Sequence, residues 1–159
     1  MSGRPGWKRL AAALTAVVLS AGCSSSWDEA ERHAVELARR SAARADQLAL
    51  VVRSNPGLAV NQPLPDELSG QVAGSDKVRV AVSSWTQEPA QPLVLRAAID
   101  ARGEAQEWLG STTSAVARLC IEVTSSASSG STTRDAPCDP NLPASMGLGN
   151  VDVVTALSG

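Results

Sequence analysis

A chain of 159 residues is long enough to form one domain with a buried core and too short for two domains of ordinary size. Acidic residues outnumber basic ones, 16 to 14, which argues against nucleic acid as a partner, because nucleic-acid binding needs concentrated positive charge. The chain has no Phe and no Tyr, so its core must be built from Val, Leu, Ile and Ala, with four Trp as the only aromatic side chains.

Residues 1–22 have the layout of a secretory signal peptide. Arg4, Lys8 and Arg9 make a positive start, residues 10–19 are apolar and uncharged, and three small residues follow. The apolar run is too short to cross a bilayer as a helix, which needs about 20 residues. We therefore expect this segment to direct export and to be removed.

A cysteine directly follows the small residues and precedes three serines. The stretch Leu19-Ser20-Ala21-Gly22-Cys23 resembles the lipobox of bacterial lipoproteins, with the leucine one position further from the cysteine than in the commonest form. The resemblance implies cleavage between Gly22 and Cys23 and a diacylglycerol on the Cys23 sulfur, whose two acyl chains anchor a protein stably. The alternative is an ordinary signal peptide with an incidental cysteine.

Residues 23–26 would then be the lipid attachment site and a short polar tether, and residues 27–159 a single extracytoplasmic domain. Removal of the leader takes away three basic residues and no acidic one, which leaves 11 basic against 16 acidic residues and a net charge of −5. The expected location is the extracytoplasmic face of the cell membrane, with the membrane as a partner through Cys23. The Arg- and Ala-rich composition resembles that of proteins from GC-rich genomes, such as those of actinobacteria.

The first element of the domain is predicted to be a helix. Ser26 and Glu29 have the spacing of a capping box, and small and apolar residues then recur at helical spacing. We expect one long helix over residues 27–54, which docks by its more apolar C-terminal half and leaves its start nearer the membrane. Residues 55–77 carry several Pro and Gly and are predicted to be a linker.

From residue 78 the apolar period changes to two. This alternation predicts an antiparallel β meander of about four strands over residues 78–124, with a hairpin turn at Arg102-Gly103. The predicted fold class is therefore α+β, a long N-terminal helix followed by the meander. Residues 125–159 are predicted to be a Ser/Thr-rich loop and tail, with a short final strand at 151–154.

Two cysteines remain once Cys23 is assigned to the lipid. Cys120 and Cys138 are expected to form one disulfide, which is permitted outside the cytoplasm. Because Cys120 alternates with Leu119 and Ile121, its sulfur is expected on the opposite face of the sheet, where the bond would fasten the tail. The alternative is a redox or metal pair, for which the CxxC spacing is missing.

No group in the sequence stands out as catalytic or metal-binding. His33 is the only histidine and has no nucleophile motif near it. Asp135 and Asp139 lack the ligand spacing of a dedicated calcium loop. Trp85 and Trp108 have two interpretations, as large packing units of a core without Phe or Tyr, or as a contact surface.

These patterns predict a membrane-anchored extracytoplasmic lipoprotein that is not an enzyme, needs no cofactor and binds an envelope protein or a small ligand. The layout of lipobox, N-terminal helix, strand meander and late cysteine is similar to that of the small uncharacterised envelope lipoproteins of actinobacteria, a resemblance that implies no particular activity. The alternative is a small envelope hydrolase that uses surface carboxylates, and two acids meeting in one pocket would favour it.

Overall fold

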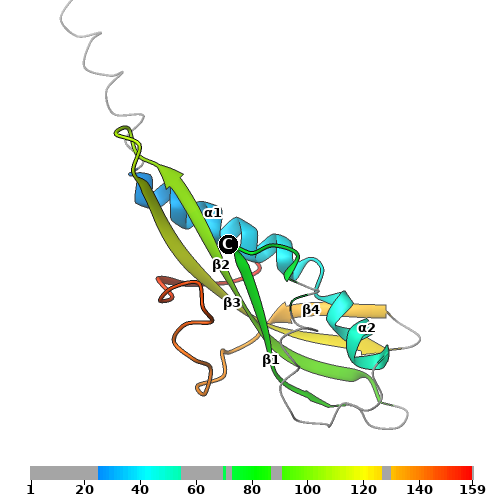
Figure 1. The fold of residues 1–159 in the computed structure, drawn as a ribbon. Coiled ribbons are helices and arrows are strands. Elements are labelled where there is room, and N and C mark those ends of the chain that lie inside the picture. Colours follow the sequence, from blue (N-terminus) through cyan, green and yellow to red (C-terminus); the bar gives the residue numbers. More distant parts are fainter. Residues whose placement is uncertain (1–24, 55–69, 71–72, 87–90, 127–129, 159) are drawn as a thin grey trace, which may run out of the picture.

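The computed structural model describes residues 25–54, 70, 73–86, 91–126 and 130–158. The predicted leader, its cleavage site at Gly22 and Cys23, and most of the linker over 55–77 lie outside these residues. The described part is an α+β fold, as predicted, with two helices packed on one face of a largely antiparallel sheet (Figure 1). No helix in the described part has the length and apolar character needed to span a membrane.

The first helix, α1 (Ser26–Ala42), begins one residue earlier than predicted. Its N-cap is Ser25, whose hydroxyl accepts from the Asp28 backbone N–H at 3.1 Å, while the Asp28 carboxylate accepts from the Ser25 N–H at 3.1 Å. The capping box is therefore Ser25–Asp28 and not Ser26–Glu29. Both spacings fit the sequence, but in the folded protein the Ser26 hydroxyl contacts the side chains of Glu107 and Thr113 instead.

The predicted single helix over 27–54 is wrong, because the chain bends after Ala42 and starts a second helix, α2 (Asp46–Ser54). The bend contains no Gly or Pro and is built from tight backbone bonds, in which Arg44 and Ala45 donate to the carbonyls three residues before them. Apolar residues on both sides of the bend are buried in one core. The bend keeps these buried residues on the sheet. Helix α1 packs on β2 (Leu93–Gln106) and β3 (Thr112–Ser126), and α2 packs on β3 and β4 (Gly130–Asp135).

The sheet contains β1 (Val78–Thr86), β2 (Leu93–Gln106), β3 (Thr112–Ser126), β4 (Gly130–Asp135) and β5 (Val153–Thr155). β1 to β4 form an antiparallel meander in chain order. β5 pairs with β3 in parallel, beside Ala117 to Leu119, where β4 does not reach. The predicted antiparallel meander is thus confirmed, but its fourth strand is β4, which lies beyond the predicted range of 78–124. The short final strand predicted at 151–154 is found at Val153–Thr155, and its parallel pairing was not expected.

Two predicted connections differ from the structure. Arg102-Gly103 is not a turn, since β2 continues through it to Gln106 and the chain reverses at 107–111, with Gly110 at φ +83°. Part of the Ser/Thr-rich loop and tail predicted over 125–159 is strand β4. Small hydroxyl side chains hold this strand to β3, as in the 2.9 Å hydrogen bond between the Ser131 and Ser125 hydroxyls.

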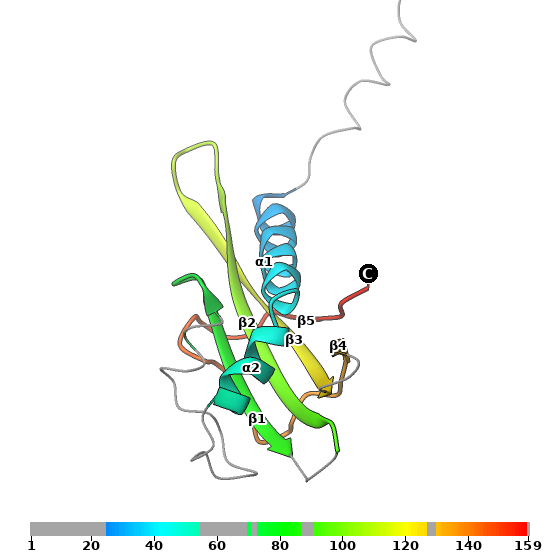
Figure 2. The same ribbon diagram turned by 90° about the vertical axis from the view of Figure 1, so that its right-hand side faces the viewer.

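The helices and the tail cover opposite faces of the sheet (Figures 1 and 2). The helix face carries the main core, whose largest fully buried side chains are Leu48, Leu93, Leu95, Ile99, Leu119 and Ile121. Trp85 belongs to this core as well. The opposite face, called the outer face here, is crossed by residues 136–152, called the tail segment.

Cys120 and Cys138 form a disulfide, as predicted, with their Cα atoms 5.2 Å apart. Cys120 lies between Leu119 and Ile121, two core residues, so strand alternation places it on the outer face. The disulfide therefore fastens the start of the tail segment to the outer face of β3.

Replacing both Cys120 and Cys138 by alanine is expected to lower the free energy of unfolding by about 3 kcal/mol, because an unbridged chain gains loop entropy in its unfolded state. The bridged residues are separated by 18 positions. Guanidinium titrations of the double variant and the oxidised wild type would measure the difference. An unchanged midpoint would show that the bond adds no stability, whereas adding a reductant to the wild type should reproduce the loss.

Candidate functional site

The outer face is patterned by charge in rows that run across the strands. One row is Arg79, Asp100 and Arg118, which are neighbours in the register of β1, β2 and β3. Four residues along the strands, a second row places Glu122 between Arg96 and Arg134. Opposite charges on neighbouring strands stabilise a sheet, so both rows are consistent with a structural role for these side chains on the outer face.

The Asp100–Arg118 pair is the most buried ion pair of the described residues. Arg118 donates from Nε to Asp100 Oδ1 at 2.7 Å and from Nη2 to Oδ2 at 2.8 Å. Asp100 is 0% exposed and Arg118 is 7% exposed, although both lie on the outer face. The side-chain hydrogen bond to Asp100 raises the pKa of Arg118. Both carboxylate oxygens are used by the arginine, so the geometry is that of a structural pair.

Glu122 accepts from two arginines in the second row. Arg96 donates from Nε to Oε2 at 3.1 Å, and Arg134 donates from Nε to Oε1 at 2.9 Å and from Nη2 to the same oxygen. The carboxylate is buried, whereas both guanidinium groups remain largely exposed. The hydrogen bond from Arg134, followed by the one from Arg96, holds the pKa of Glu122 below its ordinary value, against the effect of burial.

Acidification is expected to remove the stability that Glu122 contributes. Because the pKa of Glu122 in the folded protein lies below the ordinary value of 4.5, this contribution is fully present above pH 4.5 and is lost as the pH falls through the folded pKa. The Glu122→Gln variant should be less stable at pH 7 and should lose less stability between pH 5 and pH 3 than the wild type. Urea titrations across this range would measure both slopes, and parallel slopes would contradict the expectation.

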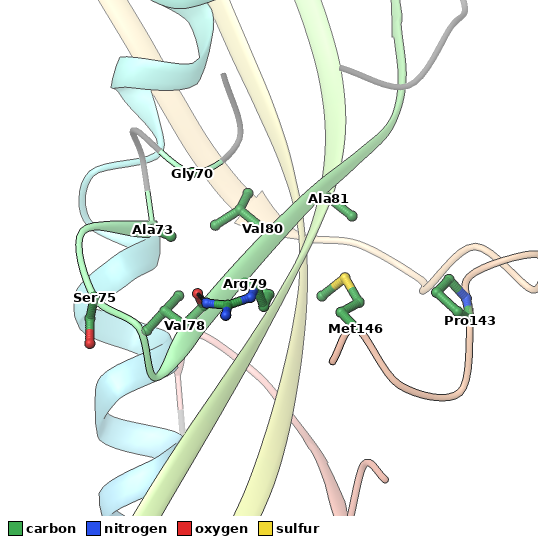
Figure 3. Close-up of a pocket in the computed structure, with 9 residues that line it drawn as sticks. All are labelled: Gly70, Ala73, Ser75, Val78, Arg79, Val80, Ala81, Pro143 and Met146. Atoms are coloured by element: carbon green, nitrogen blue, oxygen red, sulfur yellow. Dashed lines mark hydrogen bonds between the residues drawn. The ribbon is translucent and has the colours of Figure 1, made fainter. Parts of the chain in front are cut away.

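A pocket of about 520 Å³ lies along β1, beside the first charged row (Figure 3). Its described lining comes from three parts of the chain: the segment before β1, β1 itself and the tail segment. Figure 3 shows the tail residues Pro143 and Met146 on one side of β1 and Ala73 and Ser75 on the other. The described lining residues are Gly70, Ala73, Ser75, Val78, Arg79, Val80, Ala81, Pro143 and Met146.

Arg79 gives this mostly apolar pocket a positive charge. Its Nη1 donates to two backbone carbonyls, of Asp76 and Val78, both at 2.9 Å. Within the described part of the chain no carboxylate pairs with it, in contrast to Arg96 and Arg118 on the same face. None of the described lining residues is acidic. The pocket therefore offers apolar surface together with one guanidinium group that carbonyls orient and that forms no ion pair with a described acid.

The other residues singled out in the sequence have structural surroundings. His33 donates from Nδ1 to the Glu104 carbonyl at 2.9 Å. Asp135 accepts from the Leu157 N–H at 2.7 Å, and Asp139 accepts from the Asn141 N–H at 2.8 Å. Among the described residues no group of three His, Cys, Asp or Glu could hold a metal ion.

The two tryptophans have different surroundings. Trp85 is 5% exposed and packs in the core, whereas Trp108 is 99% exposed at the turn between β2 and β3. The packing interpretation thus fits Trp85, and Trp108 is free of core contacts. Comparison of the chain with protein-family models, with curated proteins and with solved structures finds no match.

Proposed function

We propose that this chain is a lipid-anchored extracytoplasmic lipoprotein, not an enzyme, whose pocket beside β1 binds a small ligand with an apolar body and an acidic group. The observation that carries the ligand class is the orientation of Arg79 in a lining of Val, Ala, Pro and Met side chains. The lipobox resemblance at residues 19–23 supports the anchor. The disulfide is consistent with an oxidising compartment outside the cytoplasm.

The placement of the carboxylates favours binding over the hydrolase alternative. Hydrolysis by a pair of acids needs two carboxyl groups facing one cleft. Asp100 and Glu122 are instead held by arginines, and Glu104 is bound by Lys77 at 2.7 Å. None of these three lines the pocket.

The experiment that tests the ligand uses protein purified from the membrane fraction. Small molecules that copurify with it would be extracted and compared by mass spectrometry among the wild type, Arg79→Ala and a matched control, Arg96→Ala on the same face. We expect one acidic amphipathic compound in the wild type and the control, reduced at least tenfold in Arg79→Ala. Equal amounts in all three proteins would remove Arg79 from the function.

Two further experiments test the lipid anchor and the alternative that the domain binds an envelope protein instead of a small ligand. The intact mass should equal residues 23–159 plus a diacylglycerol, with or without a further acyl chain on the new amino terminus. Crosslinking in cells followed by mass spectrometry would reveal an envelope protein partner. One dominant protein crosslinked near β1 would replace the small ligand as the occupant of this surface.

A further inference from the structure

The turn between β2 and β3 exposes two large apolar side chains in succession. Trp108 is 99% exposed and Leu109 is 91% exposed, and both lie in the 107–111 turn. Scattered exposed apolar residues are ordinary on protein surfaces, so exposure alone assigns no role. The position of this turn in the molecule gives it significance.

The turn is held against the start of α1. The Ser26 hydroxyl lies 3.3 Å from Glu107 Oε1 and 3.4 Å from the Thr113 hydroxyl, so it bridges the two ends of the turn. Figures 1 and 2 both show the turn and the first residues of α1 at one end of the molecule, with α2 and β4 at the other end. Trp27, in the first turn of α1, is also partly exposed there.

The length of the chain ties this end to the lipid. Only Ser24 separates Cys23 from Ser25, the N-cap of α1. Two peptide units span at most about 7 Å between Cα atoms, so a lipid on Cys23 leaves the start of α1 no room to move away from the membrane surface. This step rests on the proposed function, because it requires the lipid on Cys23.

We infer that the turn carrying Trp108 and Leu109 inserts into the lipid headgroup region beside the anchor, so that the domain stands on the membrane by this end. Trp favours the membrane–water interface, where its ring is half in apolar surroundings and its N–H can meet polar groups. The turn and the diacylglycerol then act as two attachments, one of which also fixes the orientation of the domain.

The charges at this end indicate how the contact is made. Asp28 and Glu29 lie in the first turn of α1, and Glu107 lies in the hairpin turn itself. These acids disfavour attraction to anionic lipid. The contact is therefore apolar, and replacing part of a zwitterionic bilayer by anionic lipid should not strengthen it.

The inferred orientation places the pocket away from the lipid. The β1 residues that line the pocket pair with Ala98 to Ala101 of β2. Five or more strand residues separate these positions from Gln106, where β2 ends before the turn, a distance of about 17 Å along the strand. The pocket would then open above the headgroups, within reach of ligands from the aqueous side.

Quenching by brominated lipid tests the insertion. The lipidated full-length protein would be reconstituted into phosphatidylcholine vesicles with ordinary or brominated acyl chains, and the emission of Trp108 obtained as the difference between the wild type and Trp108→Phe. We expect brominated lipid to remove at least half of this difference emission. Trp85→Phe, which removes a buried core residue, is the matched control, and its difference emission should change little.

Three outcomes are distinguishable. An intact mass without lipid on Cys23 would overturn the anchor and the insertion together. A lipidated protein whose Trp108 emission is the same in both kinds of vesicle would overturn the insertion alone. A photo-crosslinking amino acid at position 108 should label phospholipid in cells, and a single protein adduct would assign the turn to a protein partner and also overturn the insertion.

Discussion

Replacing Gly103 by alanine is expected to destabilise the protein by more than about 3 kcal/mol, the upper part of the range for overpacking. An added Cβ at Gly103 would lie 2.0 Å from the Ala30 carbonyl oxygen and 2.3 Å from the Ala34 nitrogen. Both atoms belong to the backbone of α1, so no side-chain rotation can relieve the overlap. The helix would have to move away from β2.

The small residues on α1 explain this close approach. Its buried face is formed by Ala30, Ala34, Ala38, Ser41 and Ala42, which have little side chain to hold the helix away from the sheet. Lifting α1 would open space beside each of them, since none of these five side chains is long enough to fill the gap. The effect should therefore extend along the whole helix.

Gly70→Ala is the matched control for Gly103→Ala. It adds the same methyl group at a position where no atom of the described residues lies within 4 Å of the new Cβ. Its free energy of unfolding should stay within about 0.5 kcal/mol of the wild type. Guanidinium titrations of the three proteins would measure the difference, and equal stability of the two variants would show that α1 does not pack closely on β2.

Gly103 also shows where sequence reasoning about the fold stops. The alternation of apolar residues over 78–83, 93–100 and 115–124 correctly indicated strands, because a half-buried strand can be recognised from its own sequence. A glycine in a sequence indicates only that the position has no room for, or no use for, a side chain. Glycine occurs for this reason both in turns and where a helix packs closely on a strand, and only the packed structure distinguishes the two cases.

The bend between α1 and α2 is hidden for a similar reason. Ala43, Arg44 and Ala45 are good helix formers, so nothing local predicts an interruption. Tertiary packing decides, since the buried stripe must follow the sheet. By contrast, the alternation of Cys120 with Leu119 and Ile121 along the strand was sufficient to place the disulfide on the outer face, because strand alternation is a local property.

The candidate pocket could not be found from the sequence. Arg79 and Met146 are 67 positions apart, and they meet only because the tail segment crosses the outer face to reach β1. The sequence showed Arg79 as one polar residue of an alternating strand and Met146 as part of a Gly-containing turn. The lipobox resemblance is the opposite case, since five adjacent residues carry it, and it stays a prediction because they lie outside the described residues.

Replacing Asp100 by alanine is expected to cost about 3–5 kcal/mol, the range seen when one partner of a buried ion pair is removed. The guanidinium group of Arg118 would keep its charge in surroundings that leave it only 7% exposed. Its strong intrinsic basicity prevents it from escaping the cost by losing a proton. The tail segment should loosen over the outer face to admit water, and its amide hydrogens should exchange faster.

The double variant Asp100→Leu, Arg118→Met separates two effects: the cost of leaving one buried charge without its partner, and the net stability that the ion pair contributes. With both charges gone, apolar side chains of similar size leave no buried charge unpaired, and replacements of this kind are often neutral or stabilising. We expect the double variant to recover most of the stability that Asp100→Ala loses. If it is as unstable as the single variant, then the Asp100–Arg118 hydrogen bonds are themselves needed to hold the outer face. If Asp100→Ala is as stable as the wild type, then Arg118 reaches water or another carboxylate, and the pair is not buried in solution.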